Sequence, residues 1–482
     1  MRPTLAFLHP ELVSAVLAEA RRILAEVGVD VQGAALRSRV LDAGLRPDAA
    51  CRRVLFPDAV VDPALARVPS SFWLHDRYGQ PRAELGSGRT HFVPGSSGLR
   101  VVDHRTGVTR NALTADFRAY VRVAGDLPGI DYLATAFSTA DVPAEIADAW
   151  RLFLVLTESR APVVTGAFTE HGVPRMAAML RLFRRDAADL AARPMAIFTV
   201  TPTGSFRYGD DSCQNLLDCA EAGIPIEIVP VTLMGLIAPV TPVGAAVFHA
   251  ADALAGIVMA QLVRPGLPVL WGAAPAAFHM RLATSQMSAV EAMRVAVMST
   301  ELGRALGIPT QAYLAFSSSK LVDAQSGAET AMGAVLAALS GVDQVAGPGM
   351  LDELLAFSLP KLVLDAELCL QARHLVRDVI PMDDLPTTDL VRELLAEGQL
   401  LVADQTLAHW PAELHLPGPV IDRDTPEHWV TAGSLDTAAR AALEVERRIA
   451  AWEPVDVPEP AVVAQLRCLV GEGLPAGVAL PD

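Results

Sequence analysis

Short apolar runs recur along the chain, and each is followed by a longer stretch with helical spacing of its apolar residues. Seven runs begin near positions 130, 161, 194, 224, 267, 308 and 342, so one repeat takes 30 to 43 residues. Most of them follow a proline or a glycine. Strands that alternate with helices at this spacing form βαβ units and a parallel sheet. The pattern predicts seven such strands, and we expect an eighth after Leu362.

A closed (β/α)8 TIM barrel is the fold class that this α/β repeat predicts. An open doubly wound sheet is disfavoured because no run ends in a GxGxxG turn. We assign residues 1–127 to N-terminal helices and a β-hairpin region packed on the barrel, residues 128–385 to the barrel, and residues 386–482 to a C-terminal elaboration. The hairpins are expected at residues 89–110, around Gly-Ser and Arg-Thr-Gly turns.

Composition narrows the class further. Hydrophobic residues make up 51% of the 482 residues and aromatic residues 5%, which suits Ala-, Val- and Leu-rich strands covered by helices on both faces. A formal net charge of −16 argues against nucleic acid as a partner. Five scattered cysteines indicate reduced thiols, and the N-terminus has no secretory pattern, so we expect a cytoplasmic protein. The apolar stretch 243–262 contains His249 and Asp252 and is predicted to be a buried barrel helix instead of a membrane span.

Familiar catalytic motifs are absent from the sequence. It has no GxSxG, HExxH or Walker motif and no paired cysteines, and its histidines are spread singly, so we expect no metal site. This absence favours a reaction that depends on orientation and electrostatics instead of a protein nucleophile.

Aromatic residues lie at or near the ends of several predicted strands. They are Phe137, Phe168, Phe198, Trp271 and Tyr313. If these rings face the mouth of the barrel, they would form a cage that attracts a quaternary ammonium group by cation–π interaction. The alternative is that they only fill volume in the barrel.

Polar loops follow three of the strands. They contain His279 and Arg281 after the fifth run, Ser317 to Gln325 after the sixth, and Gly347 and Gly349 after the seventh. Lys320 or Arg281 would meet a substrate carboxylate. The alternatives are that Ser317–Ser319 cap the next helix, that His279 is an ordinary loop residue, and that Lys320 and Asp323 form a weak surface pair.

Long segments of the chain resemble the trimethylamine/glycine-betaine:corrinoid methyltransferase family. They include HPELVSAVLAEARRILAEVGVDV, VVDHRTGVTRNALTADF, GLIAPVTPVGAAVFHAADALAGIVMAQLVRPGLPVLWG, SSSKLVDAQSGAE and GSLDTAARAALEVERRIAAWEPVDVPE. The resemblance implies a TIM barrel that passes a methyl group from a methylated amine to the cobalt of a separate corrinoid protein. Because the chain has no pyrrolysine, it resembles the branch without that residue, which includes glycine-betaine methyltransferases.

The chemistry implied by this resemblance needs little from the protein. Cob(I)alamin is itself a strong nucleophile, and a quaternary ammonium leaves as a neutral amine without a general acid. The enzyme then supplies proximity and orientation. The cobamide would be carried by the corrinoid partner, with none tightly bound to this chain.

The pocket differs from the family pattern at three places. Thr203 follows a proline where Leu is common, His279 stands at the start of a run that is often Asp-Met-Arg, and Ala346 replaces a frequent histidine. These departures leave the identity of the methylated amine open.

The candidate site therefore contains an aromatic wall and a polar loop. We predict substrate contacts from Phe198, Trp271, Tyr313, Arg281 and Ser319. Candidates for a catalytic role are His279, Lys320, Asp323 and Gln325, and Gly347 and Gly349 would leave room for the corrin. The alternatives are a corrinoid-independent barrel enzyme acting on a small anionic or methylated metabolite, and a non-catalytic ligand-binding subunit. We also expect a homo-oligomer.

Overall fold

The computed structural model describes residues 3–167, 172–454, 457–472, 474 and 479–481. Short parallel strands form its centre in two hydrogen-bonded groups. One group has the order β15-β13-β11-β10-β9, and the other has the order β18-β19-β6. The strands are β6 (His91–Val93), β9 (Leu133–Ala134), β10 (Val163–Thr165), β11 (Ala196–Val200), β13 (Ile226–Ile228), β15 (Val269–Trp271), β18 (Gln311–Tyr313) and β19 (Gln344–Ala346).

Backbone hydrogen bonds join the two groups at both ends. The Trp271 N–H at the end of β15 donates to the Pro309 carbonyl, at 2.8 Å, just before β18. On the other side, the Asp131 N–H donates to the Phe92 carbonyl of β6 at 2.9 Å. The Asp131 carboxylate accepts the Phe92 N–H in return, at 2.8 Å. The described strands thus close into an eight-stranded parallel barrel, which confirms the predicted fold class.

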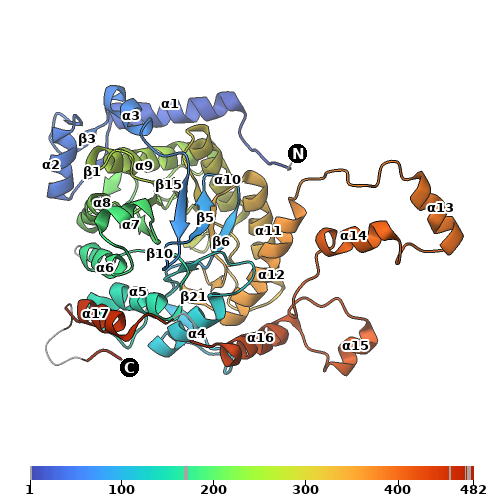
Figure 1. The fold of residues 1–482 in the computed structure, drawn as a ribbon. Coiled ribbons are helices and arrows are strands. Elements are labelled where there is room, and N and C mark those ends of the chain that lie inside the picture. The colour runs from blue at the N-terminus through green and yellow to red at the C-terminus, as the bar shows by residue number, and fades with distance from the viewer. Residues whose placement is uncertain (1–2, 168–171, 455–456, 473, 475–478, 482) are drawn as a thin grey trace.

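A helix follows each strand and packs outside the barrel (Figure 1). The helices are α4 (Thr114–Ala124), α5 (Ala147–Glu158), α6 (Gly172–Arg181), α8 (Asp210–Ala222), α9 (Pro242–Val263), α10 (Val290–Ala305), α11 (Ala324–Ser340) and α12 (Leu359–Leu375). In the described chain, α9 alone is long and apolar enough to cross a membrane by length and composition, and 83% of its most apolar window is buried inside the protein.

The seven predicted strands are all present, but the eighth was predicted in the wrong place. The chain after Leu362 continues α12, and the missing strand is β6, within the region expected to form hairpins. Because β6 has only three residues and a Gly-Ser turn follows it, its sequence pattern resembles a hairpin arm. The predicted boundary at residue 127 therefore separates the first barrel strand from the other seven. One hairpin does form nearby, from β7 (Arg100–Val102) and β8 (Thr109–Asn111).

The N-terminal segment covers one side and one end of the barrel. The helices α1 (Pro10–Glu26), α2 (Ala34–Asp42) and α3 (Asp58–Leu65) all pack against α9. The hairpin of β4 (Phe72–His75) and β5 (Pro81–Leu85) lies at the amino ends of the strands. There the His75 N–H donates to the Pro194 carbonyl before β11, and the Gly86 N–H donates to the Asp343 carboxylate before β19. This hairpin therefore covers the amino end of the barrel.

The remaining elements are short or lie near the C-terminus. The short ones are β1 (Asp30–Val31), β2 (Arg46–Pro47), β3 (Val54–Leu55), a 3₁₀ turn (Ala144–Ile146), α7 (Ala187–Ala192), β12 (Arg207–Tyr208), β14 (Leu233–Met234), β16 (Ala276–His279), β17 (Thr284–Gln286), β20 (Met350–Leu351) and β21 (Ala356–Phe357). The helices α16 (Thr437–Ala451) and α17 (Pro460–Gly471) pack on α12 and α5 respectively. Between α12 and α16, α13 (Thr388–Glu397), α14 (Asp404–Glu413) and α15 (Pro426–Thr431) project from the body (Figure 1).

Closure at β6 can be tested at Asp131. Asp131→Ala removes the acceptor of the Phe92 N–H and the carboxylate that pairs with Arg373, and we expect it to lower the free energy of unfolding by about 2 kcal/mol or more. Asp126→Ala changes an exposed carboxylate in the same connection and should stay within about 0.5 kcal/mol of the unmodified protein. Urea unfolding measures both, and equal effects would contradict this role for Asp131.

Candidate active site at the carboxyl end of the barrel

A pocket of about 350 Å³ opens where several barrel strands end. Its walls come from the last residues of β10, β11 and β18, from residues that follow β6, β9, β10 and β11, from the start of α8, and from one arginine of α5. They are Ser96, Ser97, Thr135, Arg151, Thr165, Gly166, Ala167, Thr199, Val200, Thr201, Asp211, Ser212, Asn215 and Tyr313. The carboxyl end of the strands is where TIM barrels assemble their active sites. The lining is unusually rich in hydroxyl groups.

Arg151 places a positive charge in this wall. Its side chain is buried, and its Nη1 donates to Ser97 Oγ and to the Thr135 carbonyl, both at 3.0 Å. Burial lowers the pKa of Arg151 to about 10, and neighbouring Asp148 opposes the shift. The guanidinium therefore remains charged at neutral pH, in surroundings where little water screens it.

Glu227 lies inside the barrel, next to the pocket. Thr199, which lines the pocket, donates to Glu227 Oε1 at 2.6 Å. Gln344 Nε2 donates to Oε2, and Gln344 Oε1 accepts the Tyr132 hydroxyl at 2.9 Å. Since β13 and β19 are not neighbours in the barrel, these side chains meet across its interior. Burial raises the pKa of Glu227 to about 7, against the opposing effect of its two hydrogen bonds.

Two further polar side chains complete the pocket. The Tyr313 hydroxyl lies 3.3 Å from Ser96 Oγ. Burial raises the pKa of Tyr313, so the hydroxyl stays protonated at neutral pH. Asn215 donates from Nδ2 to the Ala167 carbonyl at 3.3 Å, whereas its buried Oδ1 has no partner among the described residues. An unpaired buried acceptor beside a cavity suits a ligand that donates a hydrogen bond or carries positive charge.

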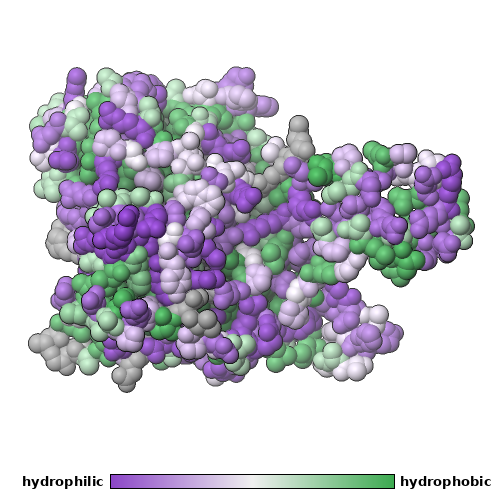
Figure 2. All heavy atoms as spheres, in the orientation of Figure 1, coloured by the Kyte–Doolittle hydropathy of each residue, from purple (hydrophilic) through white to green (hydrophobic). Residues whose placement is uncertain are grey.

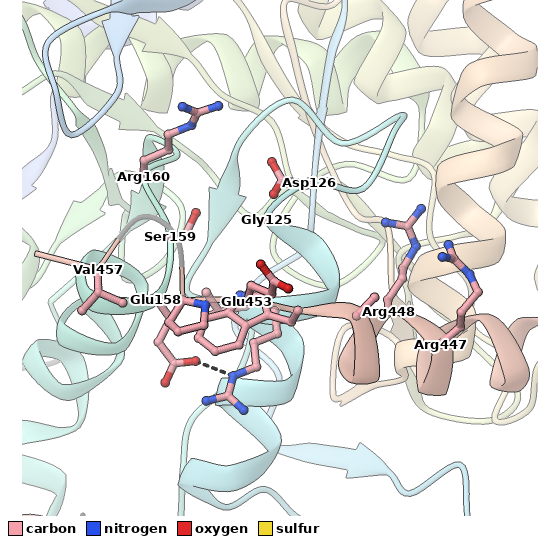
Figure 3. A pocket seen from close by; sticks show the side chains of 14 residues that line it. Gly125, Asp126, Glu158, Ser159, Arg160, Arg447, Arg448, Glu453 and Val457 are labelled. Carbon is pink, nitrogen blue, oxygen red and sulfur yellow. Dashed lines mark hydrogen bonds and ion pairs between the residues drawn. The ribbon is translucent and has the colours of Figure 1, made fainter.

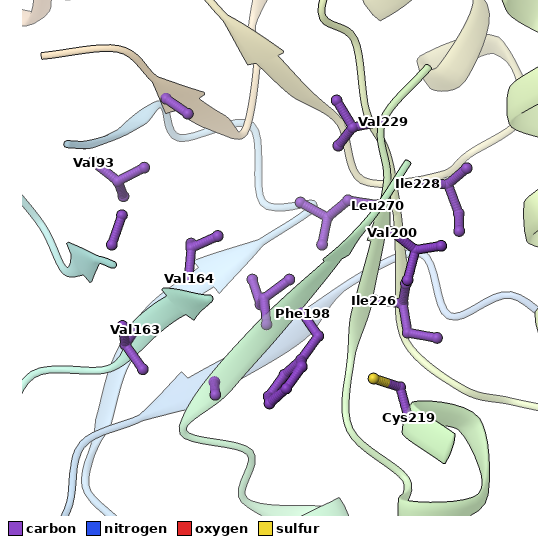
Figure 4. Close-up of a cluster of buried hydrophobic side chains, with 14 of the residues drawn as sticks. Val93, Val163, Val164, Phe198, Val200, Cys219, Ile226, Ile228, Val229 and Leu270 are labelled. Carbon is purple, nitrogen blue, oxygen red and sulfur yellow. The ribbon is translucent and has the colours of Figure 1, made fainter. Parts of the chain in front are cut away.

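The predicted aromatic wall does not form. Trp271 points into the helical layer, where its Nε1 donates to Ser299 Oγ of α10 at 2.9 Å. Phe198 pairs with Ile226 in the strand register, one residue away from the Thr199–Glu227 pair that meets inside the barrel, so strand alternation directs its ring to the outer face, the side on which Cys219 of α8 lies (Figure 4). Of the three rings predicted to contact substrate, Tyr313 alone faces the mouth. Phe168 lies outside the described residues.

The predicted polar residues lie on a neighbouring part of the rim. His279 and Arg281 belong to the hairpin of β16 and β17, where His279 Nδ1 accepts the Leu282 N–H at 3.1 Å and Arg281 is exposed. Across a separate groove from this hairpin lie Ser319, Lys320, Asp323 and Gln325. Neither set lines the pocket that holds Arg151.

The polar side chains of the loop after β18 are mostly engaged in hydrogen bonds and ion pairs with nearby residues. Asp323 caps α11 by accepting the Ser326 N–H at 2.9 Å, and Gln325 donates to Glu329 at 2.9 Å. Ser319 Oγ accepts the Leu321 N–H at 3.2 Å. Lys320 forms an ion pair with Asp352 at 3.2 Å, and its side chain is 69% exposed, so the pair contributes little. These contacts fit the structural alternatives better than a catalytic role.

The two glycines predicted to leave room for a corrin are required by packing. A Cβ on Gly347 would lie 1.9 Å from the Leu314 carbonyl oxygen. Gly349 has a φ of +89°, and its Cβ would lie 2.5 Å from the Phe357 ring. Thr203 also has a local role, since its Oγ1 accepts the Gly209 N–H at 2.8 Å. Ala346 is buried between Tyr313 and Val93 of the neighbouring strands.

The sequence-based prediction of the site did not include Arg151 or Glu227, although each is a charged residue inside an apolar run. Glu227 interrupts the apolar strand IPIEIVP, and Arg151 interrupts the apolar helix AWRLFLVL. Charged side chains are almost never fully buried without a partner, so a charge inside such a run is a signal for a functional site. No group of three or more possible metal-ligating side chains occurs in the part of the chain that the structure describes.

A second cavity, of about 360 Å³, forms where α4 and α5 end, on the side of the amino ends of the strands. Arg447 and Arg448 of α16 also line it, and Figure 3 shows these residues from close by. The charges of this cavity are largely paired: Arg122 with Glu158 at 2.8 Å, and Arg448 with Glu444 at 2.8 Å. Features at the amino end of a TIM barrel generally serve stability, so the carboxyl-end pocket is the better candidate.

Comparison with known proteins places the chain in a family. The model of the trimethylamine methyltransferase (MTTB) family matches residues 1–470. The trimethylamine methyltransferase MttB of Desulfitobacterium hafniense is 23% identical over 97% of this chain and 94% of its own length. That of Methanosarcina barkeri is 25% identical over 88% and 86%. The glycine betaine methyltransferase of D. hafniense is 22% identical over 98% and 97%. The chain belongs to the trimethylamine methyltransferase family, which confirms the predicted resemblance.

Solved structures support the fold. The crystal structure of the monomethylamine methyltransferase MtmB of M. barkeri aligns over 93% of this chain and 88% of that chain, with a TM-score of 0.57 and 9% sequence identity. Its hydroxylamine complex gives a TM-score of 0.52 at 10% identity. At these identities the likeness concerns the fold alone.

The packing role of Gly347 gives a direct test. Gly347→Ala forces a methyl group into a backbone carbonyl, and we expect a loss of about 3 kcal/mol in the free energy of unfolding, because a strand cannot shift as a flexible side chain can. Gly327→Ala on α11 is the matched control: no heavy atom lies within 4 Å of the added carbon, and helix propensity should make it neutral or stabilising by up to about 1 kcal/mol. Thermal and urea unfolding measure the stability of both variants. If Gly347→Ala leaves the free energy of unfolding unchanged, packing does not require this glycine, and the prediction that it leaves room for a corrin stands.

Proposed function

We propose that this chain transfers a methyl group from a quaternary amine with an anionic end, a betaine, to the cobalt of a corrinoid protein. The family supports methyl transfer from a methylated amine. The observation that supports this substrate class is the pair of opposite charges at the barrel mouth, Arg151 in the pocket wall and Glu227 next to its floor. A betaine carries the complementary pair of charges within one small molecule.

The ammonium end would lie on the side of Thr199 and Tyr313. Glu227, held through Thr199, supplies negative charge there, and the oxygens of the wall accept weak contacts from N-methyl groups, whose carbons carry part of the positive charge. A cation brought near Glu227 also favours its ionised form. Charge and oxygen contacts thereby replace the aromatic cage that the sequence suggested.

The carboxylate end would meet Arg151. Its hydrogen bonds to Ser97 Oγ and the Thr135 carbonyl fix the guanidinium plane at the pocket wall. A guanidinium held this way matches a carboxylate in charge and geometry. The substrate would then be held at both ends, which limits the directions in which its methyl groups can point.

The chemistry would depend on orientation. The corrinoid of the partner, when bound, supplies the nucleophile that accepts the methyl group. The residues of this chain bind the amine, orient it and exclude water, and the described lining of the pocket contains no cysteine or histidine that would compete as a nucleophile. A quaternary ammonium leaves as a neutral amine, so no proton donor is required.

The rim of the barrel fits a partner that covers the mouth. Loops that follow β13, β15, β18 and β19 expose large apolar side chains on this end: Leu236, Ile237, Val240, Met280, Leu282, Leu321 and Leu355. The loops after β13 and β15 touch, since the Met280 side chain reaches Gly235. Ser205, in the loop after β11, donates to the Ile237 carbonyl. Exposed apolar patches of this kind mark interaction surfaces. A corrinoid protein docked there would face the pocket.

The direct experiment mixes the purified protein with free cob(I)alamin and, separately, glycine betaine, longer betaines and trimethylamine. We expect the absorption change of methyl-cobalt formation with at least one betaine and none with trimethylamine. Methyl transfer from trimethylamine alone would disprove the betaine assignment. If no substrate gives the change while betaines still raise the melting temperature, the chain binds ligand without catalysing this transfer.

Glu227→Gln tests the ammonium side. The pKa of the Glu227 carboxyl in the folded protein is about 7. Betaine binding should therefore strengthen about tenfold between pH 6 and pH 8 as Glu227 ionises, and Glu227→Gln should bind betaine weakly at both pH values.

The same residue gives a prediction for stability. Because the folded pKa is raised, Glu227 contributes stability that is fully present below its unfolded pKa and lost as the pH rises through about 7. The variant should therefore be at least as stable as the unmodified protein at pH 8. Calorimetric binding and thermal unfolding measure the two effects. Glu221→Gln, an exposed site on α8, is the control.

A further inference from the structure

A series of hydrogen bonds leads from the pocket wall into the barrel interior, and we call its four residues the Glu227 network. Thr199 donates to Glu227 Oε1 at 2.6 Å, and Gln344 Nε2 donates to Oε2. The Tyr132 hydroxyl donates to Gln344 Oε1 at 2.9 Å. Polar side chains cover much of the surface that Figure 2 shows, where water solvates them, whereas Glu227, Gln344 and Tyr132 are at most 1% exposed. These buried groups therefore depend on one another for their hydrogen bonds.

The direction of the hydrogen bonds in the network is not fixed by side-chain shape, because a glutamine amide can turn over and a hydroxyl can donate or accept. In the structure, the Tyr132 hydroxyl donates to the Gln344 oxygen, and the Gln344 N–H donates to Glu227. Both carboxyl oxygens of Glu227 thus receive donors. A carboxyl that only accepts is in its ionised form. The observed direction therefore matches a charged Glu227.

The reverse direction would leave the Tyr132 hydroxyl without an acceptor. A neutral Glu227 would donate its proton to the Gln344 oxygen, and the amide nitrogen would donate to Tyr132. The Tyr132 proton would then need another acceptor, yet among the described residues Gln344 is the one hydrogen-bond partner of this hydroxyl. Burying a hydroxyl without an acceptor is costly. Tyr132 therefore disfavours the arrangement in which Gln344 accepts a proton from Glu227.

The other acceptor that a neutral Glu227 could use is the hydroxyl oxygen of Thr199. If the carboxyl donates to this oxygen, the Thr199 proton no longer points at Glu227 and is free to turn toward the pocket that Thr199 lines. The wall would then present a hydrogen-bond donor where the ammonium end is proposed to lie. With an ionised Glu227, Thr199 donates inward and remains an acceptor toward the pocket.

Hydrogen bonds, and not a nearby cation, support the charge of Glu227 in the free protein. Burial raises the pKa of its carboxyl, and the hydrogen bonds from Thr199 and Gln344 oppose this rise. The negative charge of Glu227 in turn contributes to the raised pKa values of Tyr132 and Tyr313, so both hydroxyls stay protonated. The other titratable or charged groups near the network come from neighbouring elements: Arg151, His91, Asp131 and Asp343.

We propose that Tyr132 and Gln344 are positioning residues for the ammonium end of the substrate: Tyr132 fixes the direction of the Gln344 amide, and this amide holds Glu227 as a charged acceptor. The inference rests on the proposed function, in which Glu227 attracts the ammonium group. Neither Tyr132 nor Gln344 lines the pocket, so both act on the substrate through Glu227. Tyr132 thereby affects the pH at which the protein binds a cation, although its hydroxyl is bonded to Gln344 and not to the carboxyl.

Tyr132→Phe tests the proposal by removing the hydroxyl and keeping the ring. The Gln344 amide can then turn over and accept a proton from neutral Glu227. The midpoint of pH-dependent betaine binding should therefore rise from about 7 to about 8, with binding about fivefold weaker at pH 7 and nearly unchanged at pH 9. Calorimetry over this pH range measures the midpoint. An unmoved midpoint overturns the proposal, and so does a loss of affinity by the same factor at every pH, which would indicate a purely structural role.

Tyr120→Phe is the matched control. The Tyr120 hydroxyl is also fully buried and donates to the Ala134 carbonyl at 2.7 Å, away from the network. This variant should lose stability but keep the midpoint of betaine binding. A shift as large as that of Tyr132→Phe would mean that any lost buried hydroxyl has this effect, which would also overturn the proposal.

Gln344→Leu tests whether Tyr132 acts through the amide. Removing the donor should raise the midpoint at least as far as Tyr132→Phe does. The double variant Tyr132→Phe/Gln344→Leu should have the midpoint of Gln344→Leu alone, because Tyr132 has no route to Glu227 once the amide is gone. A further rise in the double variant would contradict this order of action.

Infrared difference spectroscopy separates this inference from the proposed function. The C=O stretch of the protonated carboxyl reports the titration of Glu227 without substrate, and the band that Glu227→Gln removes identifies it. If betaines do not bind but Tyr132→Phe still raises the midpoint of this band, the betaine assignment fails and the control of Glu227 by Tyr132 is supported. If betaines bind and the band titrates identically in both proteins, the proposed function stands and the positioning role is wrong.

Discussion

The hydrogen bonds that hold β6 between β19 and β9 determine where the rest of the candidate site lies. Without them the two groups of parallel strands would leave an open gap on one side, and the Ser96–Ser97 loop after β6 would have no fixed position. That loop meets Arg151 through Ser97 and Tyr313 through Ser96, so it joins two walls of the pocket. A short contact between Asp131 and the Phe92 backbone therefore affects both stability and the geometry of the mouth.

The interior of the barrel is more polar than its fold requires. A barrel of this size is normally filled by branched apolar side chains, yet Glu227, Gln344 and Tyr132 meet at its centre. Burying a carboxylate there is costly even with two hydrogen bonds, as the raised pKa of Glu227 shows. Departures from the most stable choice are expected where a site must act on charge. This cost is the strongest physical reason to place the ammonium end of a substrate beside Glu227.

The sequence predicted the frame of the barrel well and its mouth poorly. Seven strands follow from the repeat because a buried strand and its helix must each be apolar over a set length. The strand β6 was not predicted as a barrel strand, because three residues are too few to show the apolar pattern of a buried strand. The facing of Phe198 and Trp271 depends on strand register, which a one-residue shift inverts, so proximity to a strand end did not predict the mouth. The exposed residues Lys320 and Asp323 were predicted to be functional because their side chains are charged. In the structure Asp323 caps a helix and Lys320 forms a surface ion pair.

The two ends of the barrel also fix the direction from which a large partner can act. The β4–β5 hairpin lies over the amino end, where the Asp343 carboxylate accepts the Gly86 N–H at 2.8 Å. The Glu227 network lies in the interior between the two ends, and the interior of a TIM barrel is a packed core and not a pore. A group too large to enter the pocket must approach the bound amine from the carboxyl end. Under the proposed function, the apolar rim at that end would receive the corrinoid partner, and the charged pocket beneath it would direct a methyl group toward that partner.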